Sequence, residues 1–128
     1  MKDLQSSNMV YNRVVTQEDT AKFEAGEVHP VYATFALGRD AEWVCRLFVL
    51  EMKEEDEEGI GTYLHITHHS PAFIGDQVFF EAKIKAVNGH EVIAIFEARV
   101  GDRLIASGET GQKILKKSKI EEVFKRLR

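Results

Sequence analysis

Residues 76–100 read DQVFFEAKIKAVNGHEVIAIFEARV, and apolar and polar side chains alternate through most of this stretch. Successive side chains of a β-strand point to opposite faces, so the alternation predicts two strands, each with one apolar face. Asn88-Gly89 separates them and favours a type I′ turn, whose two central residues both need a positive φ. The stretch therefore predicts a tight antiparallel hairpin. Its apolar face carries Val78, Phe80, Ala82, Ile84, Ala86, Val92, Ala94, Phe96, Ala98 and Val100.

Further strands are predicted on both sides of this hairpin. Gly101-Asp102 provides a second tight turn, and residues 103–115 form the third strand of an antiparallel meander. Within that strand, Gly108 and Gly111 indicate a bend, a bulge or the close approach of another backbone. Upstream, residues 60–70 form a strand whose even-numbered apolar row ends at His68, and a weaker strand signal lies within residues 12–23.

Residues 34–52 have a helical period instead. Their apolar side chains recur three and four positions apart, at Leu37, Ala41, Val44, Cys45 and Phe48. Further large apolar residues extend this surface over most of the circumference, so we expect the helix to be buried against the sheet and against a second surface. Thr34 can act as the N-cap by accepting a hydrogen bond from a first-turn amide.

The two ends of the chain complete the predicted architecture. Residues 118–121 fit a capping box, which predicts a short amphipathic C-terminal helix over residues 117–128. Residues 1–11 are expected to be a loose N-terminal segment. Residues 1–128 are thus predicted to form one domain of the α+β class, an antiparallel sheet wrapped around one long central helix. Its uncovered sheet edges and helix flank favour dimerisation.

The composition excludes several classes of function. The chain has 128 residues, of which 44% are hydrophobic and 30% charged, as in globular proteins. Its formal net charge of −4 argues against nucleic-acid partners, and no apolar run approaches the roughly 18 residues that would span a membrane. The first residues lack the apolar core of a signal peptide, so a cytoplasmic protein is expected. The single cysteine excludes an internal disulfide and any multi-cysteine metal site.

Two residues are candidates for proton transfer. His68 closes an apolar row, and it is either a core histidine bonded to backbone or an imidazole at the mouth of a pocket that exchanges protons near neutral pH. Glu42 lies in the middle of the predicted helix. It either forms an exposed ion pair with Arg46 or, where a partner subunit partly desolvates it, serves as a base or nucleophile.

Other polar residues have simpler interpretations. His65 and His69 alternate to the face opposite His68, so one strand cannot direct all three imidazoles at one ion, and no metal site is predicted. Cys45 falls on the apolar stripe of the helix and is interpreted as a packing residue. From the residues alone, the chain is a soluble α+β domain with a candidate pocket.

Four short motifs resemble a known family. They are Val31-Tyr32-Ala33-Thr34, Ala41-Glu42-Trp43-Val44-Cys45, Gly61-Thr62 and Thr67-His68. With them the chain resembles the hotdog-fold thioesterases, specifically the fluoroacetyl-CoA thioesterase-like branch, from Arg13 to Leu115. That branch has a threonine at the start of the central helix, a glutamate eight residues later and a histidine near the end of the next strand. Thr34, Glu42 and His68 match this pattern.

The resemblance implies a hotdog fold and a homodimer with two active sites, each between the central helix of one protomer and the sheet of the other. It implies an enzyme that hydrolyses a short or small acyl-CoA thioester without a cofactor, coenzyme A being part of the substrate. Glu42 would activate water or attack the carbonyl itself, and His68 would act as general acid and base. The Thr34 hydroxyl would orient the reacting groups, and the backbone amide near Gly61 would donate to the oxyanion.

The family pattern leaves several points open. Charged Arg39 and Asp40 lie between Thr34 and Glu42, so the acyl group does not follow from the match. Arg39 or Arg46 could meet an acyl carboxylate, a phosphate of coenzyme A or a neighbouring acid. A non-catalytic binder of acyl-CoA or a small acid is a second hypothesis. An enoyl-CoA hydratase is a third, disfavoured because no aspartate lies five residues before a histidine. Whether dimers pair into tetramers also stays open.

Overall fold

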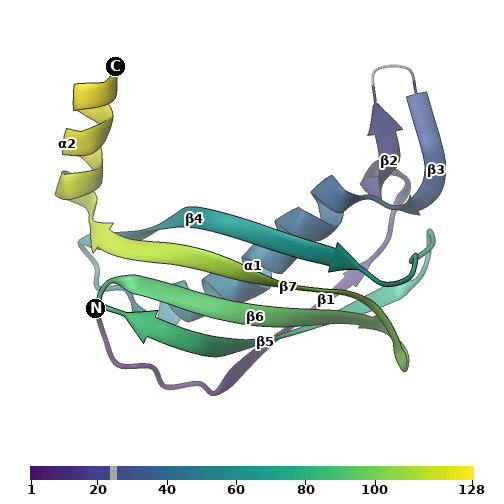
Figure 1. Cartoon of the computed structure of the whole chain (residues 1–128), viewed down its shortest axis with the longest axis horizontal. Helices are drawn as coiled ribbons and strands as arrows, with labels where there is room; N and C mark the ends of the chain where they lie inside the picture. Colours follow the sequence, from purple (N-terminus) through teal and green to yellow (C-terminus); the bar gives the residue numbers. More distant parts are fainter. Residues whose placement is uncertain (24–25) are drawn as a thin grey trace.

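The computed structural model describes residues 1–23 and 26–128 (Figure 1). Five strands form one antiparallel sheet in the spatial order β1-β5-β6-β7-β4, and β2 and β3 form a separate hairpin. None of the described helices is long and apolar enough to cross a membrane. In chain order, the elements are β1 (Asn8–Val14), a 3₁₀ turn (Gln17–Asp19), β2 (Thr20–Phe23), β3 (Gly26–Tyr32), α1 (Thr34–Met52), β4 (Glu57–His68), β5 (Gln77–Asn88), β6 (Glu91–Val100), β7 (Arg103–Lys116) and α2 (Lys117–Leu127).

The core lies between α1 and one face of the sheet. The predicted apolar stripe of the helix is buried, and so are most of the predicted inward side chains of β5 and β6, while Ile84 and Val100 are partly buried. Ala86 was wrongly predicted to face inward, because a register shift between Ile84 and Ala86 pairs it with Ile93 on the other face of the sheet. Strands bury alternate side chains and helices bury a stripe. The period of two in β5 and β6 and the helical period in α1 therefore mark the two surfaces that pack against each other. The predicted α+β arrangement of a sheet around one long helix is confirmed. The largest fully buried side chains are Phe48, Phe80, Phe96, Leu37, Ile105 and Ile114.

The meander contains both predicted hairpins, with a correction to the first turn. β5 pairs Asn88 with Glu91, so Gly89 and His90 form the centre of the turn instead of Asn88 and Gly89. Gly89 has a φ of 62°, and no residue other than glycine has a positive φ among the described residues. A glycine in the first central position fits a type II′ turn. The type I′ prediction was therefore wrong by one residue.

The N-terminal region also differs from the prediction. The strand expected within residues 12–23 is two strands, β1 and β2, separated by the 3₁₀ turn. β1 begins at Asn8, inside the segment predicted as loose, and pairs antiparallel with β5. Its burial alternates between half-buried and exposed residues because it forms an edge of the sheet. An edge strand of this kind carries a weaker apolar pattern than a central one.

Both helices begin where the sequence predicted, at Thr34 and Lys117, but their N-cap residues are not the predicted ones. The N-cap of α1 is Ala33, so Thr34 is the first helical residue and its hydroxyl makes no capping bond. The N-cap of α2 is Lys116 instead of Ser118, again without a side-chain capping bond. For α1 the reason is visible in the structure, since the Thr34 hydroxyl is bonded to His68.

A β-bulge interrupts the pairing of β4 with β7. Gly61 and Tyr63 pair with successive residues of β7, so Thr62 is the extra residue. The glycines of β7 allow the close approach predicted for them, because a Cβ on Gly108 would lie 1.9 Å from the backbone oxygen of His65. The bulge therefore belongs to β4, while β7 contributes the tight packing.

The bulge changes which side chains of β4 face α1. Before it, a Cβ on Gly59 would touch Val49 of the helix. After it, Leu64 and Ile66 lie against Gly38 of the helix. The even-numbered row predicted for residues 60–68 is therefore correct only from position 64 onward.

β4 and β1 are the two edges of the five-stranded sheet. β4 exposes Tyr63 and Leu64, and Phe35 of α1 is exposed beside it in an open groove. An edge strand also presents unpaired backbone donors and acceptors. This side of the molecule thus offers both hydrogen bonds and apolar surface to a partner.

Candidate active site

Thr34 and His68 meet at the N-terminal end of α1. Oγ1 of Thr34 lies 2.8 Å from Nε2 of His68, a hydrogen-bonding distance, although the residues are 34 positions apart in the chain. Thr34 reaches this place because it opens the helix, and His68 because it is the last residue of β4. The contact also confirms the prediction that His68 is on the side of its strand that faces the helix.

A cavity of about 410 Å³ opens beside this pair, and we call it the histidine cavity. Its walls come from the start of α1, from β3 and from the loop after β4. The volume lies within the range of small-molecule sites. The lining residues are Ala21, His29, Val31, Tyr32, Ala33, Thr34, Leu37, His68, His69, Ser70, Pro71, Ala72 and Ile105.

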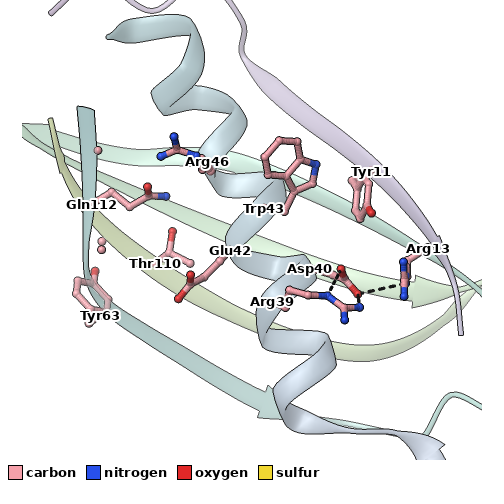
Figure 2. Close-up of a pocket in the computed structure, with 13 residues that line it drawn as sticks. Tyr11, Arg13, Arg39, Asp40, Glu42, Trp43, Arg46, Tyr63, Thr110 and Gln112 are labelled. Carbon is pink, nitrogen blue, oxygen red and sulfur yellow. Dashed lines mark hydrogen bonds and ion pairs between the residues drawn. The ribbon is translucent and has the colours of Figure 1, made fainter. Parts of the chain in front are cut away.

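Glu42 lies in a second cavity, of about 460 Å³, which we call the carboxylate cavity (Figure 2). Figure 2 shows the Glu42 carboxylate reaching from α1 toward Thr110. Within residues 1–23 and 26–128, this carboxylate has no hydrogen-bond or ion-pair partner. The first of the two alternatives for Glu42, an ion pair with Arg46, does not occur, because Nη2 of Arg46 donates to Glu58 at 2.9 Å. Glu42 is therefore an exposed carboxylate available to a ligand.

Gly61 lies on the wall of the carboxylate cavity. Strict alternation would place Gly61 and His68 on opposite faces of β4, and the bulge at Thr62 brings them to the same face. A Cβ at Gly61 would meet no atom within 4 Å, so its backbone is open to a ligand.

Within one chain, the predicted site residues lie in two separate cavities. Thr34 and Glu42 are eight residues apart on α1, about 12 Å along the helix axis. Both line the open groove between α1 and β4, but Glu42 does not line the histidine cavity and His68 does not line the carboxylate cavity. Thr34 is thus hydrogen-bonded to His68, while Glu42 and Gly61 line the same cavity.

Buried ion pairs hold the N-terminal half of α1 in place. The carboxylate of Asp19 is fully buried and accepts hydrogen bonds from Nη2 of Arg13 at 3.0 Å and from Nη2 of Arg39 at 3.1 Å. Burial alone would raise the pKa of Asp19, but the bonds from the Thr16 backbone, Arg13 and Arg39 outweigh it and lower that pKa to about 2. The pairs tie α1 to β1 and to the 3₁₀ turn.

Asp40 is the second buried carboxylate of this network. It accepts hydrogen bonds from the hydroxyl of Tyr32 and from Nε of Arg39, the latter at 3.1 Å. Burial, and then the bond to Asp40, raise the pKa of the Tyr32 hydroxyl, which stays protonated. Arg39 is thereby engaged by two acids, as the dashed lines in Figure 2 show for Asp40.

This network was not predicted from the sequence, although one signal for it was present. Asp40 falls four residues after Ala36 and four before Val44, within the buried stripe of α1. A charged residue inside an apolar row needs a buried partner. The partners Asp19 and Arg13 lie in a turn and an edge strand without a strong pattern of their own, and only the fold brings them to Asp40.

The remaining candidates have structural roles. Burial raises the pKa of the Cys45 thiol to about 11, so it stays protonated, as expected of a packing residue. His69 follows the last residue of β4 and lines the histidine cavity, contrary to the predicted alternation, because the alternation ends with the strand. Its Nε2 lies 2.8 Å from Oγ of Ser107. In the described parts of the chain, no cluster of three or more His, Cys, Asp or Glu could hold a metal ion.

The chain is similar to one protein family and to several solved structures. The family model described as fluoroacetyl-CoA-specific thioesterase, FlK, matches residues 15–118. No curated protein matches the chain. Among solved structures, the chain is similar to the hypothetical protein TTHA0967 of Thermus thermophilus, a thioesterase superfamily member. The two are 39% identical with a TM-score of 0.93, over 99% of this chain and 95% of that one.

More distant structures share the fold. The fluoroacetyl-CoA thioesterase FlK is 21% identical with a TM-score of 0.84, over 98% of this chain and 96% of its own. A variant of FlK has been solved in complex with fluoroacetate and CoA. A hot-dog-like protein from Thermanaerovibrio acidaminovorans is 18% identical with a TM-score of 0.86, over 99% of this chain and 94% of its own. These likenesses confirm the predicted hotdog fold.

Proposed function

Because the chain belongs to the fluoroacetyl-CoA-specific thioesterase family, we propose that it hydrolyses a small acyl-CoA thioester at a site shared by two protomers. Thr34 and His68 of one protomer form the first half of this site. Glu42 and Gly61 of its partner form the second half. The presence of CoA in a complex of the relative FlK supports a CoA thioester as the class of substrate.

The spacing of residues on α1 supports a two-fold arrangement. Gly38 lies midway between Thr34 and Glu42, and it packs against Leu64 of the exposed β4 edge. If two copies pair antiparallel about this level, Glu42 of one protomer comes opposite Thr34 of the other. Thr34 and Glu42 of one chain are about 12 Å apart along α1, so the Glu42 that approaches Thr34 would come from α1 of the partner.

The spacing of residues on β4 supports the same axis. Leu64 is close to the midpoint between Gly61 and His68, so antiparallel pairing at Leu64 brings Gly61 of one strand opposite His68 of the other. The pairing would also supply partners to the open strand edge and cover the exposed Phe35. The spacings on α1 and on β4 therefore support the same two-fold axis. Pairing about that axis would complete both active sites of the dimer.

In the completed site each group has a defined step. The Glu42 carboxylate removes a proton from water while the water oxygen attacks the thioester carbonyl carbon. The backbone amide of Gly61 donates to the carbonyl oxygen as negative charge develops on it. The carbon–sulfur bond then breaks, and His68 delivers a proton to the departing sulfur. The products are a carboxylic acid and coenzyme A, while Glu42 releases its proton to solvent and His68 regains one.

The hydrogen bond between Thr34 and His68 is the observation that carries this proposal. It joins two residues from distant parts of the chain at 2.8 Å and fixes the orientation of the imidazole. The unpaired state of Glu42 agrees with a role as base, because a carboxylate engaged by an arginine would accept a proton less readily. The nearby arginines Arg39 and Arg46 are each engaged by other acids.

The test is thiol release from a panel of short and medium acyl-CoAs. We expect Glu42→Gln and His68→Ala each to lower kcat by about 10²–10⁴-fold. Glu97→Gln and His90→Ala, which change the same residue types outside both cavities, should keep wild-type rates. Wild-type protein that binds acyl-CoA saturably but releases no thiol would instead be a binding protein, and equal rates in all four variants would refute the assigned site.

A further inference from the structure

The C-terminal helix α2 contacts its own chain mainly at its start, where it follows β7 and where the amide of Lys117 donates to the carbonyl oxygen of Asp56. None of its residues is buried, and it carries an apolar stripe formed by Ile120, Val123, Phe124 and Leu127, the last of which is 79% exposed. Figure 1 shows α2 projecting past the β4 edge of the sheet, on the side where the β2–β3 hairpin also projects. The family model ends at residue 118, so nearly all of α2 lies beyond the family match.

A second apolar patch lies at the other end of β4. Val28 of β3 is 55% exposed, and Phe73 and Ile74 of the loop after β4 are also exposed. A β-bridge between Val31 and Phe73 joins the hairpin to this loop. Because Val31 and the neighbouring Ala72 line the histidine cavity, the patch forms the rim of that cavity. We call Val28, Phe73 and Ile74 the apolar rim.

Antiparallel pairing of two β4 strands would bring α2 to the apolar rim. α2 starts after Lys116, which pairs with Glu57, the first residue of β4. The apolar rim follows His68, the last residue of β4. In an antiparallel pair, the first residue of one strand lies near the last residue of the other. The α2 helix of one protomer therefore falls beside the apolar rim of its partner.

The charge on α2 indicates what it does there. With 3.6 residues per turn, Lys117 and Arg128 border the apolar stripe on one side, and Lys119 and Arg126 border it on the other. All four are exposed. When the stripe packs on the apolar rim, cations lie at the mouth of the histidine cavity. Lysine and arginine at such a mouth bind phosphate groups.

We propose that α2 of each protomer forms part of the substrate entrance of its partner and binds the phosphates of coenzyme A. This inference rests on the proposed function, since it needs both the β4-mediated dimer and a CoA thioester. It adds a source of affinity that acts far from the reacting carbonyl. It also assigns a purpose to a basic helix in a chain whose net charge is negative.

The first test compares two kinds of substrate. In the full chain, Lys119→Gln/Arg126→Gln and Lys117→Gln/Arg128→Gln remove one cationic border each. We expect at least one of them to raise KM for an acyl-CoA about tenfold, the effect of losing a charge-assisted hydrogen bond. The KM of the same acyl group on N-acetylcysteamine, which has no phosphate, should not change. Lys125→Gln is the matched control, because Lys125 lies opposite the stripe. Wild-type KM values in both double variants would overturn the inference.

The second test asks which protomer supplies the helix. Mixed dimers are purified through two different affinity tags, with His68→Ala in one chain so that only one site works. If α2 acts on its partner, KM rises when the charge variant is in the same chain as His68→Ala. It stays normal when the charge variant is in the other chain. The reverse pattern would contradict the proposal.

Failure of the function can be told apart from failure of this inference. If wild-type protein releases no thiol, the Kd of coenzyme A and of pantetheine is measured by calorimetry for the same double variants. Weaker binding of coenzyme A with unchanged binding of pantetheine would still support the helix. Equal Kd values in wild type and both variants would overturn it.

Discussion

The hydroxyl of Thr34 lies where a helix-capping group is often found, yet it bonds to an imidazole instead of a first-turn amide. The N-cap residue, Ala33, has no side-chain acceptor, so the first amides of α1 lack a side-chain cap. Ala33 and Thr34 both line the histidine cavity. The partial positive charge of the helix end therefore lies at the cavity, where it favours an anionic group of a ligand.

Replacing this hydroxyl separates its chemical role from its place in the helix. Thr34→Val keeps the shape of the side chain but removes the bond to His68, and we expect kcat to fall about 10–100-fold with little change in stability. Thr34→Ser retains a hydroxyl and should keep most of the activity. Thiol release gives the rates, and urea unfolding gives the stability. Equal rates in the valine and serine variants would show that the hydroxyl does not orient the imidazole.

At this scale the sequence predicted some contacts and not others. The period of β4 was sufficient to direct His68 toward the helix, because the last three inward positions follow strict alternation. The cap preference of threonine led to a wrong role for Thr34, since local propensity cannot register a histidine 34 residues away. Glu42 could be named from its spacing, but its lack of an arginine partner depended on Arg46 turning to Glu58.

At the scale of elements, the buried acids determine where α1 begins relative to β1. Asp19 bonds to Arg13 of β1 and to Arg39 of α1, so a single carboxylate joins two elements and the 3₁₀ turn that contains it. The backbone amide of Ala33 donates to the carbonyl oxygen of Asp19 at 2.8 Å as well. The position of Thr34 in the site therefore depends on this turn.

Asp19→Asn should destabilise the protein in a pH-dependent way. The pKa of Asp19 is lowered from 3.8 to about 2 in the folded state, so its charge stabilises the fold by about 2 kcal/mol at neutral pH. Because the folded pKa is the lower one, this contribution is complete above the unfolded pKa and is lost as the pH falls from about 4 toward 2. Urea unfolding at pH 7 and at pH 2.5 measures it. The variant should be less stable than wild type at pH 7 and closer to it at pH 2.5.

Glu18→Gln is the matched control for this measurement, since it changes the neighbouring, exposed carboxylate of the same turn. It should follow the wild-type curve at both pH values. A constant difference between Asp19→Asn and wild type across this range would mean that packing, and not the charge, provides the stability.

Elements with a strong period were predictable, and so were the two hairpins, but the exact register between paired strands was not. The strands β5 and β6 and the helix α1 each bury a face that repeats along the sequence. The turn at Gly89 and the bulge at Thr62 depend on which residues face each other across strands. A shift of one residue there reverses every later side chain. Because of the bulge at Thr62, Gly61 and His68 lie on the same face of β4, whereas strict alternation would place them on opposite faces.

At the scale of the whole molecule, the proposed dimer forms through the β4 edge of the sheet and not through the β1 edge. Leu64 on β4 lies beside the groove that links Thr34 and Glu42. We expect Leu64→Glu to weaken the dimer at least 100-fold, because two carboxylates would meet at the two-fold axis. Activity should fall with it, while the far-ultraviolet circular dichroism stays that of the folded chain. Sedimentation velocity at several concentrations reports the dissociation.

Val10 offers the control for the dimer measurement. It is 66% exposed on β1, the opposite edge of the same sheet, so Val10→Glu changes an even more accessible apolar residue. This variant should sediment like wild type and keep its activity. Dissociation caused by Val10→Glu, with Leu64→Glu still dimeric, would place the interface on β1 and leave the two half-sites unjoined.

Mixed dimers test directly whether the two half-sites join across the axis. Glu42→Ala and His68→Ala should each abolish thiol release in a homodimer. In a dimer of one chain of each kind, the chain with Glu42→Ala still provides Thr34 and His68, and the other chain still provides Glu42 and Gly61. One of the two sites is then intact, so the mixed dimer should recover about half of the wild-type kcat. If both groups acted within one chain, each chain would lack one of them and the mixed dimer would stay inactive.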